Sequence, residues 1–242
     1  MTRLRVATYN IHKGVQGLGP SRRLEIHNLG HAVEQFDADI VCLQEVRRHH
    51  RKLEKVFTRW PDLDQAGYLS PEGYESVYRT NAVTRHGEHG NALLTRWPVV
   101  DVKHSDVSDH RFEQRGLLHT QLLIEGKVVH VIVVHLGLIH ASRERQVKQL
   151  RDYVAREVPE SAPLIVAGDF NDWAAKLLKP MRDFDLQTFD SLRLPTYPSR
   201  LPLLHLDRIY FRGLAPLTAH TPQGRAWFRM SDHLPLIAEF EI

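Results

Sequence analysis

Residues 163–169 read PLIVAGD, and residues 39–45 read DIVCLQE. Each stretch carries an unbroken apolar run that leads into a carboxylate, Asp169 in the first and Glu45 in the second. Apolar runs of this length, rich in β-branched residues, are typical of strands that are buried on both faces. The two stretches therefore predict a central sheet that is covered by other layers and whose strands end in charged side chains.

The rest of the chain alternates further strands with helices. Residues 131–134 form a third buried run, and residues 236–242 alternate apolar and acidic residues, as in a strand with one face on the core. Apolar residues at helical spacing predict one helix that begins near Ser21 and another that begins near Ser142. The other faces of the second helix, with Arg143 and Arg145, are expected to be solvated. This order indicates a layered α/β or α+β fold.

Composition excludes several classes of protein. The chain has 242 residues, of which 42% are hydrophobic and 25% are charged, so it is not collagen, a wholly disordered chain or a disulfide scaffold. No linker divides it, and we expect one domain over residues 1–242. A net charge of +3 suits an anionic substrate but is too small to indicate a protein that coats nucleic acid. The single cysteine, Cys42, lies in an apolar run and is expected to be buried and inert.

The first residues contain no apolar stretch long enough for a signal peptide. The longest apolar run, around residues 128–138, contains two histidines and is far shorter than the roughly 20 residues of a membrane span. We therefore expect a cytoplasmic protein without integral membrane association, and we expect a monomer.

Polar residues gather where the apolar runs end or begin. These residues are Asn10, Glu45, His135, Asp169, Asn171, Asp207, Asp232 and His233. Any one of them alone is most simply a turn residue or a hydrogen-bonded structural residue. Together they would concentrate like charge, which a bound cation normally neutralises. Carboxylate and amide oxygens without clustered thiols suit Mg²⁺, with Mn²⁺ as a second choice.

With these residues in this order, the sequence resembles the endonuclease/exonuclease/phosphatase superfamily, and within it a bacterial branch of small members. The matching pieces, in the family's order, are Thr8-Tyr9-Asn10-Ile11, Asp39 to Val46, Gly90 to Arg96, Val133 to Leu136, Gly168-Asp169-Phe170-Asn171, Leu206 to Ile209, and Ser231 to Leu236. Each piece is weak alone, but their common order over nearly the whole chain is a strong signal. The resemblance implies an α+β fold, a four-layer α/β/β/α sandwich of two packed, mainly antiparallel sheets flanked by helices.

The resemblance also implies a hydrolase that cleaves a phosphoester with water and a divalent metal, most simply Mg²⁺. Asn10, Glu45 and Asp232 would hold the metal. Asp169 would orient or deprotonate the attacking water, and Asn171 would hold the phosphate. His233, oriented by Asp207, would contact a phosphoryl oxygen or transfer a proton, and His135 would stabilise the transition state as a donor. Glu113 is read as a partner of His135, and Arg115 as a phosphate contact.

Three functions remain open at the level of sequence. The first is a phosphodiesterase acting on a small or lipid-derived phosphoester, with the loops at residues 60–78 and 196–204 selecting the substrate. The second is a DNA endonuclease or exonuclease, for which the basic run at residues 47–55 could supply part of a track, although a solvated, helix-like surface run is the simpler interpretation. The third is an inactive member that binds a partner, which the presence of every motif residue disfavours.

Overall fold

The structure, a computed structural model, describes residues 2–189 and 194–242. One sheet contains, in spatial order, β12 (Ala215–His220), β13 (Leu236–Glu241), β1 (Arg3–Asn10), β4 (Ile40–His50), β6 (Gly87–Thr95) and β5 (Glu75–Thr84). The other contains β11 (Asp207–Arg212), β10 (Leu164–Asp169), β9 (Lys127–His135), β8 (Gly116–Ile124) and β7 (Val99–Asp106). A short ribbon is formed by β2 (Val15–Gln16) and β3 (Arg23–Leu24).

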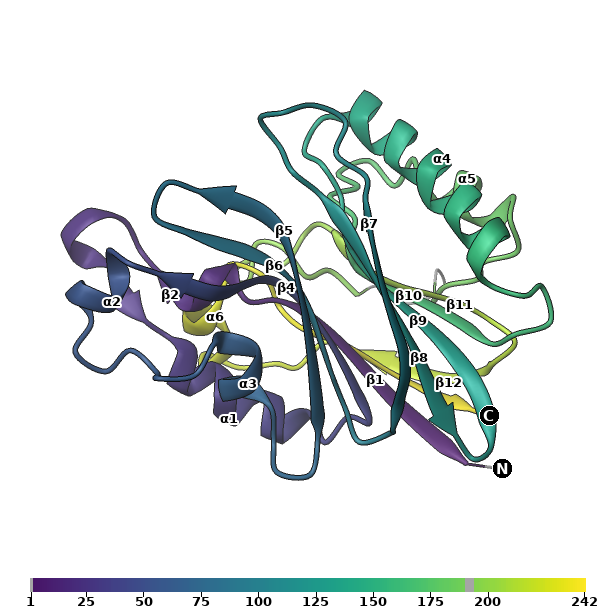
Figure 1. The fold of residues 1–242 in the computed structure, drawn as a ribbon, viewed down its shortest axis with the longest axis horizontal. Helices are drawn as coiled ribbons and strands as arrows, with labels where there is room; N and C mark the ends of the chain where they lie inside the picture. Colours follow the sequence, from purple (N-terminus) through teal and green to yellow (C-terminus); the bar gives the residue numbers. More distant parts are fainter. Residues whose placement is uncertain (1, 190–193) are drawn as a thin grey trace.

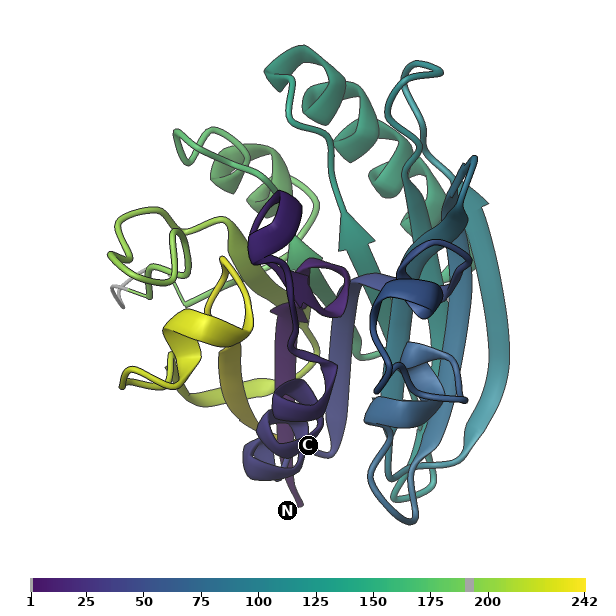
Figure 2. The same ribbon diagram turned by 90° about the vertical axis from the view of Figure 1, so that its left-hand side faces the viewer.

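The helices cover the outer faces of the two sheets (Figures 1 and 2). They are α1 (Ile26–Phe36), α2 (Leu53–Val56), α3 (Gln65–Leu69), α4 (His140–Glu157), α5 (Leu178–Arg182) and α6 (Trp227–Met230), with 3-10 turns η1 (His12–Gly14) and η2 (Gly19–Ser21). Within the described ranges, no helix is both long enough and apolar enough to cross a membrane.

Three apolar clusters separate the four layers. The middle cluster, which includes Val6, Cys42 and Ile165, is buried between the two sheets. A second cluster joins the outer face of the first sheet to α1, and a third joins the outer face of the second sheet to α4. Because alternate residues of each central strand point into different clusters, these strands are apolar on both faces. The predicted four-layer α+β sandwich is confirmed, and Cys42 is buried as expected.

Two parallel strand pairs bring the polar residues to one end of this sandwich. β1 pairs parallel with β4, opposing Asn10 to Gln44, and β9 pairs parallel with β10, opposing His135 to Asp169. Parallel neighbours end at the same edge of a sheet. The antiparallel pairing of β10 with β11 then sets Asp207 opposite Asp169. Register alone therefore gathers residues that are far apart in the sequence.

Three local expectations differ from the structure. The first helix begins at Ile26 rather than near Ser21, which instead closes the turn η2. The second helix begins at His140, two residues before the expected start. The basic run that begins at residue 47 is not helix-like at its start, because β4 continues as a strand to His50 and only residues 53–56 form the short helix α2. Cross-strand hydrogen bonds to β6 hold residues 46–50 extended.

Candidate active site

A cavity of about 330 Å³ lies at the end of the sandwich where β1, β9 and β10 terminate. The predicted site residues that line it are Asn10, Glu45, Arg115, His135, Asp169, Asn171, Asp232 and His233. The other two lie behind this lining, where Asp207 contacts His233 and Glu113 contacts Arg115. The structure thus brings all ten predicted residues into one neighbourhood.

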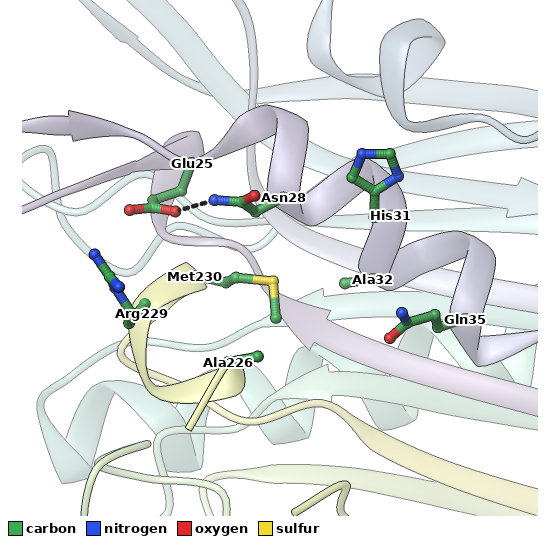
Figure 3. A pocket seen from close by; sticks show the side chains of 8 residues that line it. All are labelled: Glu25, Asn28, His31, Ala32, Gln35, Ala226, Arg229 and Met230. Carbon is green, nitrogen blue, oxygen red and sulfur yellow. Dashed lines mark hydrogen bonds between the residues drawn. The ribbon is translucent and has the colours of Figure 1, made fainter. Parts of the chain in front are cut away.

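A larger cavity of about 420 Å³ lies between α1 and α6 (Figure 3). Its one carboxylate, Glu25, accepts hydrogen bonds from Asn28 Nδ2 at 2.7 Å and from Arg23 Nε at 3.0 Å. None of the predicted site residues lines it. The side chains that could carry chemistry therefore gather in the smaller cavity.

His233 is held between two buried carboxylates. Its Nδ1 lies 2.7 Å from Oδ2 of Asp207, and its Nε2 lies 3.7 Å from Oδ2 of Asp169. Burial lowers the pKa of His233, but the two carboxylates outweigh burial, so the pKa lies above its ordinary value. Because Nδ1 donates to Asp207, the Nε2–H of the protonated ring is left to face Asp169 and the cavity.

Asp169 is fixed by donors on both oxygens. Oδ2 accepts a hydrogen bond from Asn10 Nδ2 at 3.0 Å, and Oδ1 accepts one from the backbone N–H of Asn171 at 2.9 Å. The preceding Gly168 has a φ of 151°, and a Cβ there would lie 1.9 Å from the carbonyl oxygen of Val134, so only glycine allows this strand approach. Burial, more than any neighbouring charge, raises the pKa of the Asp169 carboxyl.

Glu45 faces the cavity from the other sheet. It sits at a bulge of β4 between Leu43 and Val46 with a φ of 58°, a conformation that non-glycine residues rarely adopt. Its Oε2 accepts a hydrogen bond from Lys13 Nζ at 2.6 Å. Burial raises the pKa of Glu45, but Lys13 more than offsets this, so the pKa lies well below its ordinary value and the side chain is ionised. Such strain is commonly retained where a side chain must be aimed at a site.

Asp232 is the second ionised carboxylate of the lining. Its Oδ1 lies 3.1 Å from Nδ1 of His12, which lies two residues beyond the end of β1. Burial raises the pKa of Asp232 and so does the negative charge of Glu45, but His12 and His233 lower it below its ordinary value. Glu45 and Asp232 are therefore two anions that repel each other across one cavity.

Asp169, Asp207 and His233 also have the separations of a metal-binding group, since one ligand atom from each lies within 4.8 Å of the others. The Nδ1 of His233 is, however, engaged by Asp207 in a charge-assisted hydrogen bond. The protonated imidazole thus supplies one positive charge beside these two carboxylates, and neither of its nitrogens has a free lone pair for a metal ion.

His135 differs from His233 in its charge state. Its Nε2 lies 3.6 Å from Oδ2 of Asp169. Burial and the positive charge of Arg115 hold the pKa of His135 well below its ordinary value, so the ring is neutral. A neutral imidazole has one donor and one acceptor nitrogen, which suits a hydrogen bond to a neutral or anionic oxygen.

Glu113 contacts Arg115 rather than the expected His135. Glu113 Oε1 accepts hydrogen bonds from Arg115 Nη2 at 3.2 Å and from the backbone N–H of Leu138 at 3.1 Å. Arg115 Nε donates to the carbonyl oxygen of Leu136 at 3.2 Å. Both side chains therefore bind the loop that follows His135, and Arg115 also lines the cavity.

Two residues of α4 that were not predicted to belong to the site bind the same loop. Arg143 is 4% exposed, contrary to the expected solvated face, and its Nη1 donates to the carbonyl oxygens of Gly137 at 3.1 Å and Leu138 at 2.6 Å. Gln146 Oε1 accepts the N–H of Gly137 at 2.8 Å. A signal was present, because residue 143 lies one helical turn before Val147 and residue 146 lies one turn before Leu150, so both continue the apolar stripe.

A model of the endonuclease/exonuclease/phosphatase family matches residues 7–233, which include every strand-end residue of the cavity. The chain belongs to this family. The uncharacterized protein YbhP of Escherichia coli (strain K12) is 37% identical over 246 residues, covering 98% of this chain and 96% of YbhP.

Solved structures of the endonuclease/exonuclease/phosphatase family share the fold. A family protein from Leptotrichia buccalis C-1013-b has a TM-score of 0.79 at 16% identity, covering 99% of this chain and 100% of that chain. TDP2 from D. rerio, in complex with a single-strand DNA product, has a TM-score of 0.70 at 17% identity, covering 100% of both chains. At these identities the likeness establishes the common sandwich.

Proposed function

We propose that this protein is a divalent-metal-dependent phosphodiesterase that hydrolyses a small or lipid-derived phosphoester by attack of water. The observation that carries the proposal is the line from Asp207 through His233 to Asp169, which ends at a cavity that Glu45 and Asp232 also line. Hydrolysis of a phosphodiester requires an oriented water, positive charge at the phosphoryl oxygens and stabilisation of the leaving oxygen. The cavity offers a group for each requirement.

Asn10, Glu45 and Asp232 would hold the metal. The donor set fits a hard cation, because it offers oxygens only and because its two ionised carboxylates raise each other's free energy across the cavity. Bound there, Mg²⁺ would polarise the phosphoryl group and stabilise the departing oxygen. In the structure Lys13 balances the charge of Glu45, and the His12 ring lies beside Asp232.

Asp169 would orient the attacking water and accept its proton. Its raised pKa makes it a stronger base than an exposed aspartate, and its donors fix the direction of its free lone pairs. The water oxygen would bond to phosphorus as the ester P–O bond breaks, and the leaving oxygen would gain a proton. His233 would bond a phosphoryl oxygen through Nε2–H or supply that proton, because Asp207 holds it protonated.

His135 and Asn171 would contact the phosphate from the second sheet. Asn171 has a φ of 50°, which asparagine tolerates better than most residues, and its Nδ2 donates to the carbonyl oxygen of Leu136 at 2.9 Å. The neutral ring of His135 would donate one hydrogen bond to the transition state, and Arg115 would add positive charge at the rim.

A DNA nuclease is the second candidate. The D. rerio TDP2 structure holds a single-strand DNA product. In this chain β4 carries Arg47 and Arg48, two and three residues beyond Glu45, with Arg51 and Lys52 in the turn that follows. These four cations could follow a phosphate backbone away from the cavity.

A substrate panel separates the two candidates. We would assay Mg²⁺-dependent hydrolysis of bis-p-nitrophenyl phosphate, phospholipids, inositol phosphates, supercoiled plasmid and an abasic-site duplex, with Asp169→Ala and His233→Ala as blanks. Cleavage of the small or lipid substrates alone supports the phosphodiesterase. Cleavage of plasmid or abasic DNA that is lost in both variants would instead support the nuclease and contradict the phosphodiesterase acting on small or lipid-derived substrates. Hydrolysis of none of these, or full activity in excess chelator, contradicts a metal-dependent phosphoesterase.

A further inference from the structure

Part of the cavity lining is apolar or aromatic, and the catalytic proposal leaves it unused. Besides its polar residues the cavity is lined by Leu138, Trp173, Tyr197 and Leu206, none of which carries charge. Leu206 is buried, but Leu138 is 58% exposed and Trp173 is 42% exposed. Exposed large apolar side chains at a concave site mark a surface that a ligand covers.

The two aromatic residues of this lining, Trp173 and Tyr197, pack against each other and, through Tyr197, against a candidate catalytic residue. The Trp173 ring meets the Tyr197 ring edge to face, with centroids 5.6 Å apart and an interplanar angle of 85°. Tyr197 in turn lies 4.9 Å from the His233 ring, centroid to centroid. The neighbouring Thr196 accepts the N–H of Asp207 at its Oγ1 and the N–H of Leu234 at its carbonyl oxygen. The exposed Trp173 ring is thus linked to the candidate catalytic histidine through Tyr197.

Leu138 is exposed on a loop that is fastened down. Its N–H donates to Glu113, and its carbonyl oxygen accepts a hydrogen bond from the buried Arg143. The loop therefore does not expose Leu138 through mobility, since both of its backbone polar groups are bonded to side chains of other segments. An exposed leucine held in a fixed position beside a polar cavity gains stabilisation when a bound ligand covers it.

From these observations we propose that Leu138, Trp173 and Tyr197 form a subsite for a planar, uncharged aromatic substituent of the phosphoester. An aryl group or a nucleobase has this chemistry. The phosphate would bind at Asn171 and His135, and the ring would lie against Trp173 with its edge toward Leu138. The inference rests on the proposed function only in taking the phosphoryl group to bind in this cavity.

The test measures binding, so it does not depend on turnover. Diphenyl phosphate, dibutyl phosphate and diethyl phosphate each carry one negative charge and differ only in their substituents. Calorimetric titrations would be run in excess chelator and again with Mg²⁺. An aromatic contact of about 1–1.5 kcal/mol corresponds to roughly tenfold tighter binding of diphenyl phosphate than of diethyl phosphate. Dibutyl phosphate, flexible and apolar, should fall clearly below diphenyl phosphate.

The loop supplies a matched control. Leu138 and Ile139 are neighbours with nearly equal exposure, 58% and 56%, but only Leu138 lines the cavity. Trp173→Leu and Leu138→Ser should remove most of the preference for diphenyl phosphate, whereas Ile139→Ser should keep it. Equal binding of the three diesters, no binding of diphenyl phosphate, or equal losses in Leu138→Ser and Ile139→Ser would overturn the subsite. Aryl-selective binding without hydrolysis would keep the subsite and contradict the proposed function instead.

Discussion

Nδ1 of His233 lies 2.7 Å from Oδ2 of Asp207, and both side chains are buried beneath the cavity. The two residues are 26 positions apart in the chain. Asp207 opens β11, and His233 lies in the loop that leads into β13 of the opposite sheet. The hydrogen bond therefore links the two sheets at the site, and it determines which ring nitrogen faces the cavity.

Replacing Asp207 by asparagine should test this contact. Asp207→Asn keeps the size of the side chain but removes the charge that raises the pKa of His233. If His233 acts as a cationic donor or as an acid, kcat should fall by about 10²–10⁴-fold, the range for lost acid–base assistance. The assay is turnover of the substrate identified by the panel, with thermal unfolding as a check of the fold. Asp183→Asn, at an exposed partner of Lys179, should leave kcat unchanged; unchanged kcat in Asp207→Asn would refute the role.

Arg143 should act as a positioning residue for the loop after His135. Arg143→Gln leaves the buried carbonyl oxygen of Gly137 and the partly buried carbonyl oxygen of Leu138 without their donor, so we expect a loss of about 2 kcal/mol in the free energy of unfolding. The ¹⁵N shifts of the His135 ring and the amide shift of Gly137 should also move, and activity should fall. Arg145→Gln on the same helix breaks only an exposed pair with Asp109 and is the control. Equal effects in the two variants would contradict a positioning role.

Metal binding should depend on Glu45. Glu45→Gln removes one of the two ionised carboxylates, and since changes even to groups behind the ligands cost about 10–100-fold in affinity, at least a tenfold loss of Mn²⁺ affinity is expected. Mn²⁺ binding can be followed by electron paramagnetic resonance without any substrate. Glu75→Gln, at an exposed residue of β5, serves as the control. Tight Mn²⁺ binding by Glu45→Gln would contradict this assignment and indicate that the metal binds another group. The alternative group is Asp169, Asp207 and His233.

A buried histidine pair away from the site should make stability depend on pH. His119 Nε2 lies 3.0 Å from His130 Nδ1, and His119 Nδ1 lies 3.1 Å from the Tyr153 hydroxyl. Burial, followed by the charge of His130, lowers the pKa of His119 to about 4. The unfolded chain, with a histidine pKa of about 6.5, binds more protons between these values. The His119 contribution to stability should therefore be full above pH 6.5 and be lost as the pH falls toward 4.

Urea unfolding of the wild type and of His119→Asn at pH 7.5 and pH 5 measures this contribution. The difference in unfolding free energy between the two proteins should shrink at the lower pH. A difference that stays constant or grows would show that His119 is not held neutral in the fold.

The strand-end residues could be predicted because buried strands are conspicuous in a sequence. A run such as residues 164–167 has few alternatives to a two-sided buried strand, so the residue that follows it must lie at a sheet edge. The family resemblance then gave the order of the layers. Accordingly, Asn10, His135 and Asp169 are the last residues of their strands, and Asp207 is the first residue of β11.

Other features depend on tertiary contacts that no local pattern encodes. Glu45 lies inside β4 rather than at its end, and a bulge of the strand turns its side chain toward the cavity. The sequence of β4 contains no pattern that predicts this bulge. Arg143 was expected to be solvated because an arginine on a helix ordinarily is. In the structure it is buried, and it donates hydrogen bonds to two backbone carbonyl oxygens of the preceding loop. The partner of Glu113 was misjudged for the same reason, because it depends on how the loop after β9 folds back.

The proposed function requires Asp169 to serve a metal-dependent hydrolysis. The most direct measurement compares hydrolysis of bis-p-nitrophenyl phosphate by the wild type and by Asp169→Asn, each in excess chelator and after restoring Mg²⁺ or Mn²⁺. We expect turnover by the wild type only when metal is present, and none by the variant, whose fold and unfolding midpoint should remain close to those of the wild type. Equal hydrolysis by both proteins, or wild-type turnover that chelator leaves unchanged, would contradict it.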